Sequence, residues 1–217
     1  FRDRIMFPIH NYNGEVIAFG GRRSNEEKNF DENGKEKYSK YTNSVESELY
    51  KKEQVLYGFH LAKKSIRKEG FAILVEGYTD VISMHNAGIE NTLATCGTAL
   101  SNSQSRKIKS LCNEVVIFRD GDAPGIKAAI RDLEILLQNG FRVSVLIDDQ
   151  GADPDDIVRR EGKKVNDFIK YSKQDAIIWR AESLLESTIS DQYFHQCENL
   201  LIQKTERIEK IKKQINP

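Results

Sequence analysis

Residues 71–80 read Phe-Ala-Ile-Leu-Val-Glu-Gly-Tyr-Thr-Asp, an apolar run of five residues followed at once by a carboxylate and a glycine. An uninterrupted apolar run of this length predicts a strand that is buried on both faces. Three further runs of this kind follow it, at Thr92–Thr95, Val115–Phe118 and Val143–Ile147. The chain after residue 70 therefore contains four short strands suited to the interior of a sheet.

Segments with helical periodicity separate these runs. They lie at Asp80–Asn86, Ser103–Leu111 and Gly125–Gln138. Strands that alternate with helices predict parallel pairing, because a crossover of this length returns the chain to the same end of the sheet. We expect an α/β fold built on a parallel four-stranded sheet flanked by helices.

A small α+β subdomain is expected before the sheet. Asn13-Gly14 between two apolar arms predicts a hairpin over Ile5–Tyr12 and Glu15–Phe19, in which both turn residues take positive φ. The remaining elements are a polar loop over 22–37, a short strand over Lys40–Asn43 and a helix over Glu53–Glu69.

Only helices are expected after the sheet. Their predicted positions are Val165–Tyr171, Ala176–Leu185 and Cys197–Ile215. We accordingly divide the chain into residues 1–70, the small subdomain; residues 71–162, the parallel-sheet domain; and residues 163–217, a helical segment.

The composition narrows the class of protein. The chain has 217 residues, of which 39% are hydrophobic, enough for a core, and its apolar runs are far shorter than the ~20 residues that a bilayer requires. Three widely spaced cysteines fit neither a disulfide framework nor a zinc site, which favours a cytoplasmic location. The 33 basic and 33 acidic residues balance. Because the chain opens at Phe1, we interpret it as part of a longer protein.

Carboxylates follow three of the four predicted strands. Glu76 and Asp80 follow the first strand, Asp120-Gly121-Asp122 follows the third, and Asp153-Pro154-Asp155-Asp156 comes shortly after the fourth. Ligands of open parallel sheets bind outside the carboxyl ends of the strands. We therefore expect these acids to converge at one edge of the sheet.

Such a cluster requires a counter-charge, because two like charges ~4 Å apart repel by about 4 kcal/mol at an effective dielectric of 20. Arg119 is the only basic residue within these acidic loops. Divalent metal is the simplest partner, and all-oxygen sites favour Mg²⁺ or Mn²⁺ over zinc. Either acidic loop taken alone also fits a plain turn or helix start. We expect Glu114, Asp132 and Glu134 to be solvated surface charges.

At this point the motifs resemble the TOPRIM domain, the metal-binding module of bacterial DnaG-type primases, of type IA and II topoisomerases and of some nucleases. Its signature is a Glu after the first strand and Asp-x-Asp after the third, here Glu76 and Asp120/Asp122. Val75–Val81, Gly97-Thr98-Ala99 and Asp153-Pro154-Asp155 are similar to bacterial replicative primases in particular. The segments upstream, from Phe1–Ile9 to Lys51–Gly58, resemble the primase core just before its TOPRIM domain.

The resemblance implies synthesis of short RNA primers on single-stranded DNA from ribonucleoside triphosphates, by two-metal nucleotidyl transfer. It implies two or more Mg²⁺ or Mn²⁺ ions, with no zinc site in this part of the chain. The implied metal ligands are Glu76, Asp80, Asp120, Asp122, Asp153 and Asp155, of which Glu76, Asp120 and Asp122 are catalytic. The implied nucleotide or template contacts are Arg22, Lys40, Tyr41, Asn43 and Lys51. A contact with the replicative helicase is implied for a region outside this chain, and none with a membrane.

Several points stay open at this level. Glu76 would be either a metal ligand or the proton acceptor for the attacking hydroxyl. Arg119 stands where the family usually has an aromatic residue; it would either pair with the acids and weaken metal binding, or contact a phosphate. Two other functions use the same acids: a TOPRIM nuclease, and a metal- or nucleotide-binding part of a primase that makes no product on its own.

Overall fold

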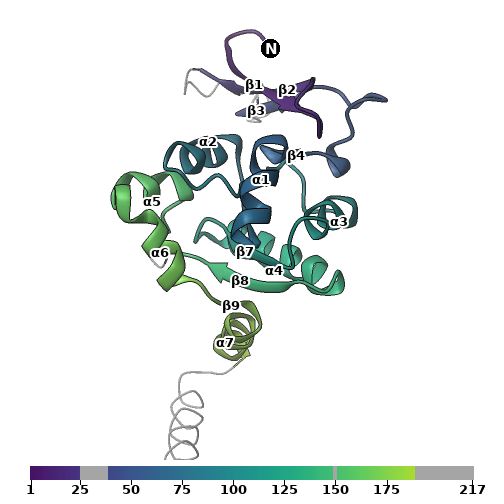
Figure 1. The fold of residues 1–217 in the computed structure, drawn as a ribbon. Coiled ribbons are helices and arrows are strands. Elements are labelled where there is room, and N and C mark those ends of the chain that lie inside the picture. The colour runs from purple at the N-terminus through teal and green to yellow at the C-terminus, as the bar shows by residue number, and fades with distance from the viewer. Residues whose placement is uncertain (25–38, 149–150, 189–217) are drawn as a thin grey trace, which may run out of the picture. The chain divides into compact units, whose positions relative to one another are not determined.

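The four apolar runs form the centre of a six-stranded mixed sheet with the strand order β4-β6-β5-β7-β8-β9. The computed structural model describes residues 1–24, 39–148 and 151–188 (Figure 1). In it, β5, β6, β7 and β8 are parallel. The strands are β4 (Leu56–Tyr57), β5 (Phe71–Val75), β6 (Thr92–Thr95), β7 (Glu114–Phe118), β8 (Arg142–Leu146) and β9 (Gln174–Asp175).

The prediction of a four-stranded sheet was wrong about its edges. β4 pairs antiparallel with β6, and β9 pairs antiparallel with β8. Each of these strands has two residues, which is too short for a hydrophobic period to show in the sequence. The α/β class with a parallel centre is confirmed.

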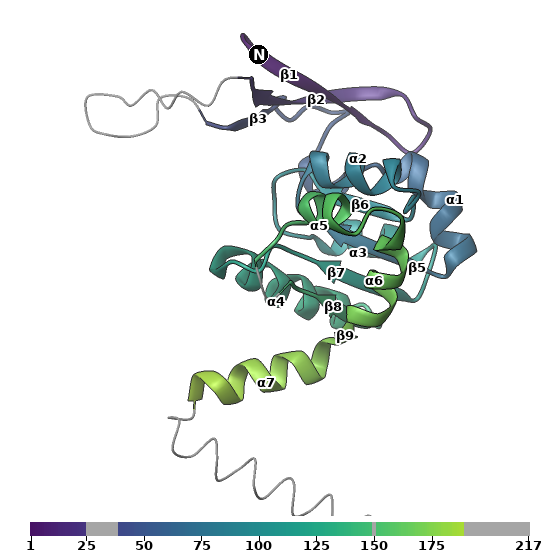
Figure 2. The same ribbon diagram turned by 90° about the vertical axis from the view of Figure 1, so that its left-hand side faces the viewer.

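Helices connect the strands and cover the sheet. They are α1 (Phe59–Glu69), α2 (Tyr78–Asn86), α3 (Asn102–Lys109), α4 (Ala123–Gln138), α5 (Pro154–Glu161) and α6 (Val165–Ser172), with 3₁₀ turns at Lys52–Gln54 and Gly162–Lys164. α2 and α5 lie side by side (Figure 2). A buried core including Ile73, Val116 and Ile157 joins one face of the sheet to α2, α5 and α6. Leu74 and Ile117, which alternate with these positions, are also fully buried, so the central strands have no solvent-exposed face.

The helix predicted over Glu53–Glu69 was wrong in its first part. Gly58 takes a positive φ of 80° and separates α1 from Leu56 and Tyr57, which pair with β6 instead. The residues ahead of Gly58 are therefore held by the sheet edge, although their apolar spacing also suits a helix.

A three-stranded antiparallel sheet precedes these elements, in the order β1 (Arg4–His10), β2 (Val16–Arg23) and β3 (Tyr41–Asn43). The predicted two-residue turn was wrong, because Gly14 has a positive φ of 91° and Asn13 does not. The side chain of Asn11 instead closes a longer loop, its Oδ1 accepting from the amides of Asn13 and Glu15 at 2.9 and 3.0 Å.

A second buried cluster joins this small sheet to the large one. It contains Phe7, Ile9 and Ala18 together with Tyr78 and Cys96. Gly20 in β2 is essential to this contact, because a Cβ there would lie 2.3 Å from the Tyr78 ring. The close approach brings the end of β2 over the start of α2.

The chain divides into two units, Phe1–Asp175 and Ala176–Pro217. The second unit contains α7 (Ala176–Thr188). Most of the predicted polar loop and the helix predicted at Cys197–Ile215 lie outside the described residues. The boundaries expected at residues 70 and 162 stay predictions. Among the described residues, no helix combines the length and apolar character needed to cross a bilayer.

Candidate active site

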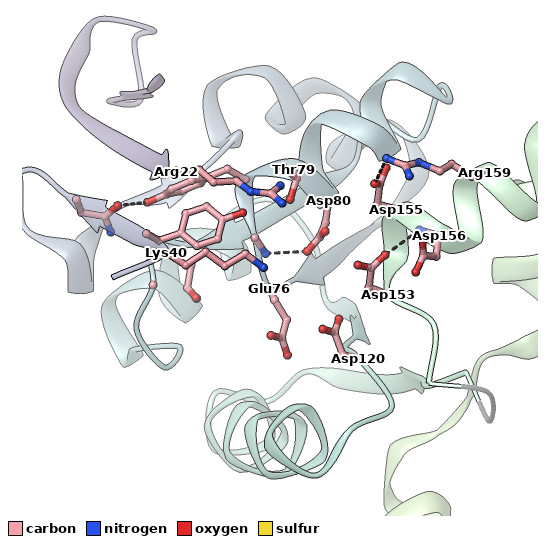
Figure 3. A pocket seen from close by; sticks show the side chains of 16 residues that line it. Arg22, Lys40, Glu76, Thr79, Asp80, Asp120, Asp153, Asp155, Asp156 and Arg159 are labelled. Atoms are coloured by element: carbon pink, nitrogen blue, oxygen red, sulfur yellow. Dashed lines mark hydrogen bonds and ion pairs between the residues drawn. The ribbon is translucent and has the colours of Figure 1, made fainter. Parts of the chain in front are cut away.

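A cavity of about 570 Å³ lies between the carboxyl ends of the central strands and the small sheet (Figure 3). Its acidic wall is formed by Glu76, Asp80, Asp120, Asp153, Asp155 and Asp156. Its other wall is formed by Arg22, Lys40, Tyr41 and Asn43. Side chains far apart in the sequence thus meet in one cavity, as the strand-end argument predicted.

Glu76 directly follows β5 and is half-buried. Its Oε1 has no solvent-accessible surface and no hydrogen-bond partner. Burial raises the pKa of this carboxyl, the nearby Arg119 guanidinium opposes the rise, and the charge of Asp120 adds to it. An oxygen buried without a hydrogen bond makes the ionised carboxylate costly unless a cation lies near it.

Asp80 lies in the first turn of α2 and is 7% exposed. Burial raises its pKa to about 6, and repulsion from Asp153, Asp120 and Asp155 contributes. The backbone amide of Gly77, which donates to Asp80 Oδ2 at 2.9 Å, partly offsets the shift. Asp80 is therefore costly to ionise when no cation is present.

Asp120 follows β7 and belongs to the same electrostatic cluster. Its pKa is raised by burial and by the charges of Asp153 and Asp122. The turn that carries Asp120 lies directly against the start of α4, because a Cβ on Gly125 would come within 2.2 Å of the Asp120 carbonyl oxygen. Only glycine permits this packing.

Asp122 and Asp153 are both helix N-caps. Asp122 Oδ1 accepts from the Gly125 amide at 2.7 Å at the start of α4, and Asp153 Oδ1 accepts from the Asp156 amide at 2.7 Å at the start of α5. Asp153 lines the cavity, whereas Asp122 is exposed and does not. The structure thus brings five of the six predicted acids together and places Asp122 at the adjoining helix start.

The predicted nucleotide-binding residues fall into two groups: four of them line the cavity, and Lys51 does not. Arg22 and Tyr41 are neighbours across β2 and β3, with the guanidinium carbon 5.9 Å from the ring centroid. Asn43 is engaged in structural bonds, since its Nδ2 donates to the Cys96 carbonyl at 2.8 Å and its Oδ1 accepts from the Tyr78 hydroxyl at 2.9 Å.

Lys51 does not join this group. It is exposed and lines a separate cavity of about 210 Å³, together with Tyr12 and Lys107. Its inclusion among the predicted site residues is therefore not supported by its position.

Seven residues that were not predicted as site residues also line the cavity: Gly77, Tyr78, Thr79, Thr95, Gly97, Asp156 and Arg159. Arg159 pairs with Asp155 at 2.6 Å on one turn of α5. The i,i+4 spacing of an acid and an arginine at a helix start was the available signal.

Asp132 was expected at the surface, and this was wrong. It is 1% exposed, and its Oδ2 accepts from the Nε of Arg119 at 3.0 Å and also from Nη2. Arg119 itself is buried, and its Nη1 lies 3.8 Å from Glu76 Oε1. Part of the counter-charge that the acids require is thus supplied by the protein.

The donor chemistry of the cavity fits a hard divalent cation. All its acidic side chains are carboxylates, and burial together with mutual repulsion raises the pKa of Asp80 and Asp120. Within the part of the chain that the structure describes, no three His, Cys, Asp or Glu side chains are already arranged to hold an ion.

Comparison with known proteins places these features in a family. A model described as Toprim-like matches residues 73–158, and one described as "DNA primase catalytic core, N-terminal domain" matches residues 1–63. A curated DNA primase of Halalkalibacterium halodurans is 40% identical over 200 residues, which are 92% of this chain and 30% of that protein.

Solved structures agree with this result. A DNA primase domain from Pseudomonas aeruginosa is 38% identical with a TM-score of 0.76, covering 86% of this chain and 56% of that chain. A DnaG primase catalytic domain bound to single-stranded DNA is 30% identical with a TM-score of 0.74, covering 87% and 57%. The chain spans less than a third of the length of the H. halodurans relative. The TOPRIM-type fold is confirmed.

Proposed function

This chain belongs to the DNA primase family, as part of the catalytic core, and from that premise we propose that it acts in RNA primer synthesis on a single-stranded DNA template. The reaction would be metal-dependent nucleotidyl transfer from ribonucleoside triphosphates. The two-walled cavity is the single observation that carries the proposal. The carboxylates of one wall suit metal ions, and the Arg, Lys and Tyr side chains of the opposite wall suit phosphates and bases. The cavity thus offers both kinds of group that nucleotidyl transfer requires.

The acidic wall would hold Mg²⁺ or Mn²⁺, two or more ions in all. Glu76, Asp80 and Asp120 are the inner ligands in this proposal, and Asp153 and Asp155 the outer ones. Asp122 would contribute from the edge through its Oδ2, since its Oδ1 accepts from the Gly125 amide. Bound cations would neutralise triphosphate charge and make the attacking 3′-hydroxyl more acidic.

The opposite wall would bind phosphate and base. Arg22, half-buried, suits a bidentate grip on a phosphate, whereas the exposed Lys40 supplies a point charge. The ring of Tyr41 is 37% exposed and offers a stacking surface for a base. Asn43 would act by positioning Tyr78 and the loop at Cys96.

The proposal extends to partners and location. The template would be single-stranded DNA, bound mainly through its phosphates and hence with a steep dependence on salt. Contact with the replicative helicase is proposed for the region of the protein outside this chain, and the setting is the cytoplasm.

The test is primer synthesis by the full-length protein that contains this chain. We expect short RNA products on a single-stranded template with Mg²⁺ or Mn²⁺, and a loss of about 100-fold or more in Glu76→Gln and Asp120→Asn variants. Glu134→Gln is the matched control, because Glu134 is an exposed acid of α4 that does not line the cavity.

Two outcomes would overturn the proposal. Metal-dependent degradation of labelled DNA without ribonucleotides, and no RNA product, would identify a nuclease. Binding of triphosphate with no product from the full-length protein would identify a non-catalytic module.

A further inference from the structure

Arg119 occupies an unusual position for a basic residue, buried next to the acidic wall. It is 4% exposed and directly precedes Asp120. Its Nε and Nη2 both donate to Asp132 Oδ2, and Asp132 Oδ1 accepts from the Leu100 amide at 3.4 Å. Two bonds from one guanidinium to one carboxylate restrict its orientation. Asp132, a residue of α4, thus clamps the Arg119 side chain in one orientation.

The clamp leaves one nitrogen of Arg119 for Glu76. Nη1 lies 3.8 Å from Glu76 Oε1, which is an ion-pair distance but too long for a hydrogen bond. Oε1 is inaccessible to solvent, although the Glu76 side chain is 36% exposed. The exposed part of the carboxylate is therefore on the Oε2 side, and Oε1 is drawn inward toward the guanidinium.

We propose that Arg119, clamped by Asp132, is a positioning residue that presents Glu76 to the cavity through Oε2 alone and weakens dication binding there. Two effects act in the same direction. A carboxylate with one oxygen held inward is limited to monodentate ligation, and a fixed cation next to the site repels a second cation. The inference rests on the proposed function, since it takes the acidic cavity as a dication site.

A purely structural role is the competing explanation. A buried Arg–Asp pair between a strand end and α4 would stabilise the fold whether or not a cation binds. The two explanations differ in one measurable property: only a positioning role makes dication affinity depend on Arg119 through Glu76.

The experiment measures Mn²⁺ binding from the electron paramagnetic resonance signal of free Mn²⁺ during titration of the 217-residue chain. The test variant is Arg119→Leu/Asp132→Leu, because removing both partners avoids leaving an unpaired buried charge and keeps the net charge unchanged. Urea unfolding verifies that each variant is folded. The control is Arg131→Ala, which removes an exposed charge from the neighbouring cavity of about 290 Å³ that Arg119 also lines.

We expect the double variant to bind Mn²⁺ about tenfold more tightly than the wild type, and Arg131→Ala to stay within about twofold. In a Glu76→Gln background the gain should shrink clearly, because the neutral amide is no longer drawn to the guanidinium and only the repulsion between the guanidinium and the dication is left to relieve. A folded double variant whose affinity is unchanged, or a gain of the same size in the Glu76→Gln background, overturns the inference.

The two proposals fail in different ways. Mn²⁺ binding by the wild type that depends on Glu76, with no effect of the double variant, contradicts only the role of Arg119. No Mn²⁺ binding by either chain contradicts both the metal site and the positioning role.

Discussion

Replacing Asp80 by Asn should stabilise the cation-free protein at neutral pH and have no effect in acid. Asp80 is 7% exposed, and its pKa in the folded chain is about 6, compared with an ordinary value of 3.8. The folded state therefore retains a proton that the unfolded state releases between these values. The stabilisation from this proton is complete below about pH 4 and is lost as the pH rises through about 6.

The magnitude follows from the gap between the two pKa values. Each pKa unit corresponds to about 1.4 kcal/mol, so ionising Asp80 in the folded chain costs about 3 kcal/mol above pH 7. Asn removes the charge and keeps a side-chain oxygen for the hydrogen bond from the Gly77 amide. We expect the variant to be more stable than the wild type by about 2–3 kcal/mol at pH 7.5, and by less than about 0.5 kcal/mol at pH 4.

The assay is urea unfolding of the two chains in a chelator from pH 4 to pH 8, with comparison of the free energies of unfolding. Asp156→Asn is the control, since this exposed acid lines the same cavity. A variant that is no more stable than the wild type at pH 7.5, or a difference that does not change with pH, would refute the reasoning. Dications should reverse the ranking if Asp80 is a ligand, because they stabilise only the chain that binds them.

Three further outcomes are expected. Gly125→Ala should lower primer synthesis about 100-fold in a labelled-ribonucleotide assay. The new Cβ would lie 2.2 Å from the backbone carbonyl oxygen of Asp120 and so displace the Asp120 side chain from the cavity. A variant with the wild-type rate would contradict this packing argument. Arg22→Ala should weaken triphosphate binding about tenfold in a fluorescence titration. Lys51→Ala should weaken it less than about twofold, since Lys51 lines a different cavity. Equal losses in the two variants would show that Lys51 also contacts the triphosphate. Cys96 is fully buried, and burial raises its pKa to about 11. At pH 8 it should react with iodoacetamide at least about 100-fold more slowly than a free thiol, measured by mass spectrometry of labelled peptides. Rapid labelling would contradict this burial and indicate local opening.

Much of the large sheet was predictable because its signals are local. β5 and β6 begin and end where the predicted runs do, since strands buried on both faces carry no charged residue. The edge strands were not predictable, because Leu56 and Tyr57 also fit the helical pattern of the residues after them. Pairing with β6, made possible by Gly58 at φ 80°, decides their conformation.

The candidate site divides in the same way. Strand ends and helix starts are properties of short segments, so the acids at residues 76, 80, 120 and 153 could be assigned to one edge of a parallel sheet from their order alone. Which charges are neutralised, and by what, depends on contacts between segments distant in sequence. Only the folded chain buries Asp132 against Arg119 and moves Lys51 to a different cavity, because burial and charge pairing are set by neighbours in space and not along the chain.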